Sequence, residues 1–186
     1  MEREKLKFKI RLYSTYWDKP PIAEIKLIKT SDKVTTDVDN KNLFDYNSNK
    51  PILNTENSYF KEEITNLKED PITITFEHEL EHGVSYDLVI KRSNKDKGQT
   101  VVEGGKIVKD QSLHIGEITI DEIDIGALVY EGIYRPEYAE PWASQQAKAG
   151  IKLSETLKNV TEMGHNGTWT FTFNSPFYMW LLENLY

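Results

Sequence analysis

The sequence has no cysteine among its 186 residues, which excludes disulfides, thiolate metal ligands and thiol nucleophiles. It also lacks any run of about eighteen apolar residues, so no segment is expected to cross a membrane. The N-terminal stretch MEREKLKFKIRLY alternates charged and apolar residues and has no apolar core of the kind found in signal peptides. These absences predict a protein of the cytoplasm, or of a particle assembled there.

Positive charge is scarce, because 23 lysines and arginines face 30 aspartates and glutamates and leave a formal net charge of −7. Binding to nucleic acid or to an anionic membrane surface requires a basic face, so neither partner is expected. A phosphate-binding loop is missing too, since EGGK at 103–106 has no Ser or Thr after its lysine. No G-x-S-x-G elbow occurs. We therefore expect no cofactor and no catalytic group of these classes.

The sequence contains many segments in which apolar and polar residues alternate. KLKFKIRLY at 5–13 places apolar residues at every second position, which is typical of a strand with one buried face. Similar patterns predict strands within 22–30, 70–80, 84–93, 101–109 and 113–125, and TWTFTF at 168–173 predicts a further strand with three aromatics on one face. Residues 31–58 are rich in Asn, Asp, Ser and Thr, so they are predicted to form a long polar loop.

The C-terminal third has a different residue pattern, with helix-forming residues in place of strict alternation. Residues 134–164 are predicted to be largely helical, with Ala143, Ala147, Ile151, Leu157 and Val160 roughly on one stripe and Gly150 as a possible break. After the aromatic strand, Ser175 is expected to cap a short terminal helix that starts at Pro176.

One motif raises the question of an enzyme. HELEH at 78–82 matches the H-E-x-x-H pattern and resembles the zincin metallopeptidases. The resemblance implies that His78 and His82 bind zinc and that Glu79 acts as general base. A third ligand would come from downstream, where the candidates are Glu103, His114, Glu117 and Asp121.

The surroundings of the motif favour a strand. Ile72, Ile74 and Phe76 alternate with polar residues directly before it, and Gly83 follows it at once. In a strand, residues four apart are separated by about 13 Å, which is too far for one zinc ion. We therefore interpret the two histidines as polar residues at the end of a hairpin, with the zinc hydrolase as an alternative.

The same region resembles part of a known fold. HELEHGVSYDLVIKR at 78–92 is similar to the late hairpin of transthyretin-like and immunoglobulin-like sandwiches, in which a glycine precedes a YxLxI strand. This resemblance implies a fold and no site. The predicted fold is mainly β, with a β-sandwich-like core at 1–130. A C-terminal extension at 131–186 would add a helical segment, a returning aromatic strand and a short helix, and the two parts could form one single domain.

Two aromatic groups are candidates for contacts. Tyr130, Tyr134, Tyr138 and Trp142 recur every four residues but are interrupted by prolines, so they either pack on the sheet or receive a ligand such as a sugar. The terminal helix is apolar on two sides, which suggests a core-facing side and a partner-facing side. The predicted partner-binding residues are Phe177, Tyr178, Trp180, Leu181, Leu185, Tyr186 and Trp142.

The preferred hypothesis is a non-catalytic structural or binding subunit of a larger protein assembly, with other protein subunits or copies of itself as partners. It rests on the missing catalytic groups and on the aromatic C-terminus. The alternatives are the zinc metallopeptidase and a β-sandwich that binds a carbohydrate or another small ligand.

Overall fold

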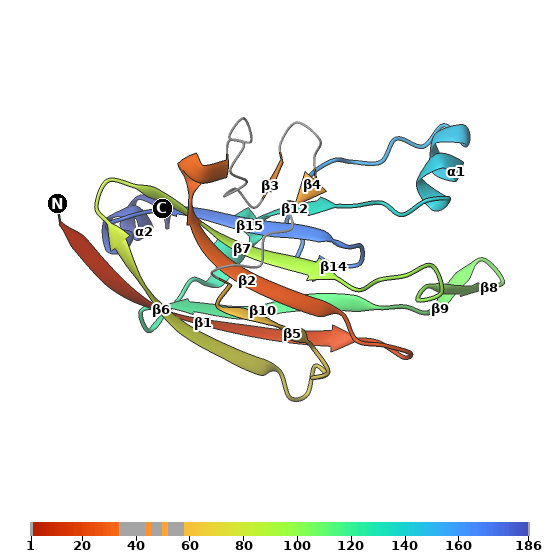
Figure 1. Cartoon of the computed structure of the whole chain (residues 1–186), viewed down its shortest axis with the longest axis horizontal. Helices are drawn as coiled ribbons and strands as arrows, with labels where there is room; N and C mark the ends of the chain where they lie inside the picture. The colour runs from red at the N-terminus through yellow and green to blue at the C-terminus, as the bar shows by residue number, and fades with distance from the viewer. Residues whose placement is uncertain (1, 34–43, 46–49, 52–57, 186) are drawn as a thin grey trace.

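The chain folds into a sandwich of two antiparallel sheets, seen edge-on in the computed structural model (Figure 1). The structure describes residues 2–33, 44–45, 50–51 and 58–185. Sheet A has the order β11-β10-β1-β6, with β14 also paired to β10. Its strands are β1 (Arg3–Thr15), β6 (Ile72–Glu81), β10 (Ser112–Ile120), β11 (Ile123–Asp124) and β14 (Glu162–Met163).

Sheet B has the order β13-β12-β15-β7-β2-β5. Its strands are β2 (Ile22–Lys29), β5 (Phe60–Glu63), β7 (Ser85–Ser93), β12 (Ile133–Pro136), β13 (Leu157–Lys158) and β15 (Gly167–Asn174). Two small hairpins lie outside the sheets, and they pair β3 (Phe44–Asp45) with β4 (Lys50–Pro51) and β8 (Val101–Glu103) with β9 (Lys106–Lys109). The helices are η1 (Thr30–Lys33), η2 (Gly126–Glu131), α1 (Trp142–Lys148) and α2 (Phe177–Asn184).

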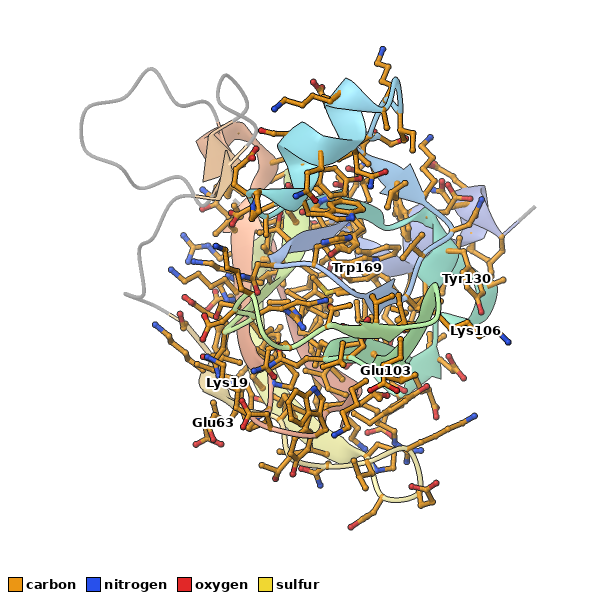
Figure 2. The ribbon with its side chains drawn as sticks, turned by 90° about the vertical axis from the view of Figure 1, so that its right-hand side faces the viewer. Lys19, Glu63, Glu103, Lys106, Tyr130 and Trp169 are labelled. Atoms are coloured by element: carbon orange, nitrogen blue, oxygen red, sulfur yellow. The ribbon has the colours of Figure 1, made fainter. Side chains whose placement is uncertain are left out.

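The core lies between the sheets and follows the alternation of the sequence. Leu6, Phe8, Ile10 and Leu12 of β1 are fully buried, while the lysines between them lie on the outer face of sheet A. Each buried side chain of this kind contributes about 1.5–3 kcal/mol relative to an exposed one. From the other sheet, β15 adds the buried aromatics Trp169, Phe171 and Phe173, and Trp169 lies inside the molecule in Figure 2. The predicted mainly β, sandwich-like fold is confirmed.

The turn between β10 and β11 explains the interrupted isoleucine pattern. Asp121 and Glu122 both have positive φ, at 52° and 70°, and connect two paired strands. A two-residue turn with positive φ at both positions matches the twist of a hairpin. Ile118, Ile120 and Ile125 therefore remain buried on either side of it.

The predicted helical segment is shorter than expected. Only Trp142–Lys148 is α-helical, and Leu157, which was assigned to the helical stripe, lies in β13. Gly150 has φ +77°, which a continuing helix does not allow. Pro136 and Pro141 prevent an earlier start because proline lacks the N–H that a helix interior needs. The seven helical residues bury no side chain fully.

Helix α2 begins at Phe177, one residue later than predicted, and is capped differently. Pro176 occupies the N-cap position, and Ser175 makes no side-chain cap to the helix. Instead, the Glu4 carboxylate of β1 accepts hydrogen bonds from the Phe177 amide at 2.7 Å and from the Ser175 hydroxyl at 2.8 Å. A carboxylate at a helix N-terminus is favoured by the helix dipole. The cap therefore comes from the opposite end of the sequence.

Strand β15 places the C-terminal part of the chain inside the sandwich, because it lies between β12 and β7 in sheet B. The division at residue 130 stays a prediction. Most of the predicted polar loop at 31–58 lies outside the described residues. Within the described residues, no helix is long and apolar enough to cross a membrane.

The two ends of the sandwich differ. Both termini and α2 lie at one end, while the β8–β9 hairpin and α1 lie at the other (Figure 1). Figure 2 looks onto the hairpin end, where Glu103 and Lys106 mark the hairpin tip.

Candidate functional site

The HELEH segment forms the end of strand β6 and the turn that follows. His78 lies on the same face as the buried Phe76 and Leu80, and its Nδ1 contacts the Tyr59 hydroxyl. Glu79 lies on the opposite face, where it pairs with Arg3 at 3.5 Å. Successive side chains of a strand point to opposite faces, so Glu79 cannot act on a metal bound at His78.

The other residues of the zinc hypothesis have separate surroundings. The Nδ1 atom of His82 lies 3.2 Å from a carboxylate oxygen of Glu2. The ring of His114 stacks on that of Tyr13, with ring centroids 4.6 Å apart. Among the described residues, no group of three or more His, Asp or Glu side chains is placed to hold a metal ion. The motif therefore lacks the helix on which zincin chemistry depends.

Helix α2 has one buried and one exposed apolar face. Phe177 and Leu181 are buried in the core, and Trp180 packs edge-on against Phe171 at 5.7 Å. Tyr178, Met179, Leu182 and Leu185 are exposed instead. Of the predicted partner-binding residues in this C-terminal segment, Phe177 and Leu181 thus serve the core. Tyr178 of α2 and Leu185 at its C-cap remain available, and Tyr186 lies outside the described residues.

The aromatic series at 130–142 does not form one stripe. Tyr130 is exposed, whereas Tyr134 is buried and its hydroxyl bonds the backbone of His165. Tyr138 and Trp142 come together at the hairpin end, with ring centroids 5.9 Å apart. The ring of His165 joins them, 5.0 Å from Tyr138 and 5.4 Å from Trp142.

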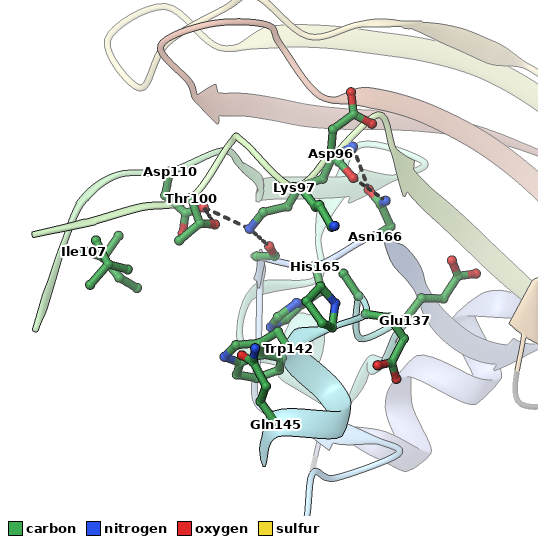
Figure 3. A pocket seen from close by; sticks show the side chains of 16 residues that line it. Asp96, Lys97, Thr100, Ile107, Asp110, Glu137, Trp142, Gln145, His165 and Asn166 are labelled. Carbon is green, nitrogen blue, oxygen red and sulfur yellow. Dashed lines mark hydrogen bonds and ion pairs between the residues drawn. The ribbon is translucent and has the colours of Figure 1, made fainter. Parts of the chain in front are cut away.

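This aromatic cluster borders a cavity of about 420 Å³, which we call the hairpin pocket. Its lining comes from three segments, namely residues within 95–110, 137–145 and 164–166. Figure 3 shows Trp142 beside His165 on the helix side and Ile107 across the pocket on the hairpin side. A cavity of this size suits a small ligand or one or two units of a longer one.

Trp142 is 39% exposed although it takes part in the cluster. It is the first residue of α1, and Tyr138 is held in the preceding segment by a hydrogen bond to the Ser154 carbonyl at 2.6 Å. The indole is therefore oriented by its aromatic neighbours and still offers part of its surface to the pocket. Gln145, one turn further along α1, adds an exposed amide.

Asp110 supplies a fixed carboxylate to the pocket. Its Oδ1 accepts hydrogen bonds from Lys95 Nζ at 2.9 Å, Thr100 Oγ1 at 2.7 Å and the Gln111 amide at 2.8 Å. Burial raises the pKa of Asp110, but these three donors outweigh that effect and place the pKa below its ordinary value. Within the described part of the chain, Oδ2 accepts no hydrogen bond. The pocket thus contains an ionised, oriented acceptor.

His165 is electrically neutral at neutral pH. Burial lowers its pKa, and the nearby cations Lys95 and Arg92 lower it further. The turn that carries it is held by Asn166, whose amide oxygen accepts from Arg92 at 2.7 Å and from the Lys95 backbone at 3.1 Å. Neutral imidazole can donate or accept one hydrogen bond at each nitrogen, depending on the tautomer.

Sequence reasoning named Trp142 but missed its partners in the pocket. The strand pattern at 101–109 was recognisable from the sequence, and GHNG at 164–167 has the glycine and polar residues of a turn. Nothing in the sequence indicated that Asp110 and His165, 55 positions apart, would face the same cavity.

Comparison with known proteins gives little further guidance. No family model matches the chain, and no curated protein matches its sequence. One solved structure with a similar arrangement is the selenomethionine form of vCBM60, a calcium-dependent carbohydrate-binding module. The two share 7% identity over 89% of each chain, with a TM-score of 0.42. At this level the similarity does not identify a ligand, which has to be inferred from the residues of the hairpin pocket.

Proposed function

We propose that the protein is a non-catalytic binding module that holds a carbohydrate in the hairpin pocket. The observation that carries the proposal is the partly exposed indole of Trp142 at the wall of a cavity with polar groups. Sugar rings present C–H groups on their faces and hydroxyls around their rims. A ligand of this kind needs an aromatic surface and hydrogen-bonding groups close together.

The polar groups of the pocket match such a ligand in kind. Asp110 Oδ2 accepts, the Gln145 amide both donates and accepts, and Lys97 donates. Asp110 is oriented before any ligand arrives, because three donors already fix its other oxygen. Preorganised groups lower the entropy that binding costs.

The proposal is tested by titrating the protein with soluble oligosaccharides and following amide shifts by NMR, with isothermal calorimetry for the stronger ligands. Trp142→Ala is expected to weaken binding by at least about 30-fold, which corresponds to about 2 kcal/mol. Tyr178→Ala is the matched control, because it removes an exposed aromatic at the opposite end of the sandwich. Binding that survives Trp142→Ala, or no binding across neutral and charged glycans, would contradict the proposal.

A second candidate function is a contact with another protein through α2. It is favoured by the exposed apolar residues Met179 and Leu182 of α2 and Leu185 at its C-cap. This candidate corresponds to an assembly subunit and does not exclude the first. Helix α2 lies at the end of the sandwich opposite to the β8–β9 hairpin and α1 (Figure 1), and both of these elements line the hairpin pocket.

A further inference from the structure

The hairpin pocket has a second apolar wall that faces the aromatic one. Val102 and Ile107 are cross-strand partners on the β8–β9 hairpin, and both line the pocket. Ile107 is 63% exposed, which is unusual for a β-branched residue on a small hairpin. Since Trp142 lies across the pocket from Ile107 (Figure 3), a ligand between them meets apolar surface on both sides.

The hairpin is held in position by the body of the protein. Trp17 donates from Nε1 to the Gln99 carbonyl at 2.8 Å, and Lys109 Nζ lies 4.6 Å from the centre of the Trp17 ring. Gln99 in turn donates to Asp18 at 2.9 Å. These contacts tie β9 and the residues that lead into β8 to the segment after β1. The wall formed by Val102 and Ile107 is therefore preorganised.

The charges of the pocket disfavour an anionic ligand. Lys95 and Lys97 line it together with the four carboxylates of Asp96, Asp110, Glu137 and Glu140. Lys95 forms an ion pair with Asp110, and the neutral His165 adds no positive charge. A carboxylated or sulfated sugar would bring its charge close to Asp110 Oδ2, and two like charges in a partly buried site repel each other.

We propose, building on the carbohydrate function above, that the pocket selects neutral pyranosides whose hydroxyls are all equatorial. In such a ring both faces carry only axial C–H groups, and the hydroxyls point outward in the ring plane. One face then packs on Trp142 and the other on Val102 and Ile107, while a rim hydroxyl donates to Asp110 Oδ2. An axial hydroxyl is pressed against an apolar wall and loses its hydrogen bond to water.

The test uses four soluble tetrasaccharides with the intact protein, measured by calorimetry and NMR titration. Cellotetraose and xylotetraose have equatorial hydroxyls, mannotetraose has axial 2-hydroxyls, and tetragalacturonate is anionic. We expect both equatorial ligands to bind at least about 10-fold more tightly than the other two, since leaving one polar group unpaired costs about 1–3 kcal/mol. Equal binding of mannotetraose or tetragalacturonate would overturn the inference and leave the carbohydrate function standing. If a carbohydrate outside this set binds and none of the four does, the inference also fails. If no carbohydrate binds at all, the proposed function itself fails.

Two variants probe the walls and the charge separately. Ile107→Ser is expected to weaken the binding of cellotetraose about 5- to 10-fold. It is also expected to reduce the ratio of the affinity for cellotetraose to the affinity for mannotetraose. Val108→Ser is the matched control, because Val108 is exposed on the same strand and does not line the pocket. Asp110→Asn removes the negative charge and is expected to reduce the ratio of the affinity for cellotetraose to the affinity for tetragalacturonate. An unchanged affinity ratio of cellotetraose to mannotetraose in Ile107→Ser would contradict the role of the apolar wall. An unchanged ratio of cellotetraose to tetragalacturonate in Asp110→Asn would contradict the role of the charge.

Discussion

The guanidinium of Arg92 donates to both oxygens of Gln111, at 2.6 Å to the backbone carbonyl and at 2.7 Å to the side-chain amide. Arg92 belongs to β7 of sheet B, and Gln111 directly precedes β10 of sheet A. The contact therefore links the two sheets at the end that carries the hairpin pocket. Burial lowers the pKa of Arg92 to about 10, so the group remains charged at neutral pH.

Arg92→Ala is expected to lower the free energy of unfolding by about 3 kcal/mol or more. The substitution leaves a cavity and deprives Gln111 and Asn166 of a buried donor. Urea unfolding followed by circular dichroism measures the effect. Arg92→Met, which keeps most of the apolar stem, is expected to lose less. A loss below about 1 kcal/mol for Arg92→Ala would mean that the buried network does not hold the sheets together.

Two neighbouring leucines of α2 separate its core role from a contact role. Leu181 is 5% exposed and Leu182 is 61% exposed. Leu181→Ala is expected to cost about 2–5 kcal/mol in thermal or urea unfolding, whereas Leu182→Ala changes stability by at most about 0.5 kcal/mol. If α2 mediates self-association, Leu182→Glu lowers the mass measured by light scattering and leaves the fold intact. Similar losses for both alanine variants would contradict the two-faced helix.

The pH dependence of stability is expected to reflect three half-buried histidines. Burial lowers the pKa values of His78, His114 and His165. The unfolded chain therefore takes up protons below about pH 6.5 that the folded chain still excludes, and stability decreases as the pH falls from 7 toward 5. A fully excluded proton costs about 1.4 kcal/mol per pH unit, and half-buried rings contribute only part of that.

The check is urea unfolding of wild type and His165→Gln at several pH values. The variant is expected to lose less stability between pH 7 and pH 5 than the wild type does. Identical pH profiles would show that His165 keeps its ordinary titration in the folded protein.

The HELEH segment is expected not to retain stoichiometric zinc. The strand places Glu79 on the face opposite His78, so the motif cannot form the site that its letters suggest. Elemental analysis of protein purified without chelators or metal-binding tags gives the answer. One zinc per chain that disappears in a His78→Ala, His82→Ala double variant would restore the peptidase hypothesis.

Local patterns accounted for most of the strands. The alternation in 5–13 predicted which side chains are buried, because the strand needs one face against the core. In 168–173 it predicted the buried aromatics, but Thr168 and Thr170 on the other face are buried as well. Helix content in 134–164 was overestimated, because alanine-rich composition says little when prolines and Gly150 interrupt the backbone.

By itself the sequence determined the mainly β, sandwich-like architecture, the strand pattern at 101–109 and the aromatic content of the hairpin end. These features depend on neighbours within a few residues, which periodicity and turn chemistry report directly. Only the tertiary structure decided that Glu4 caps α2 and that Trp142, Asp110 and Ile107 face one cavity. Such contacts join residues far apart in the chain, and they arise from how the strands pair in the sheets. No local pattern encodes them.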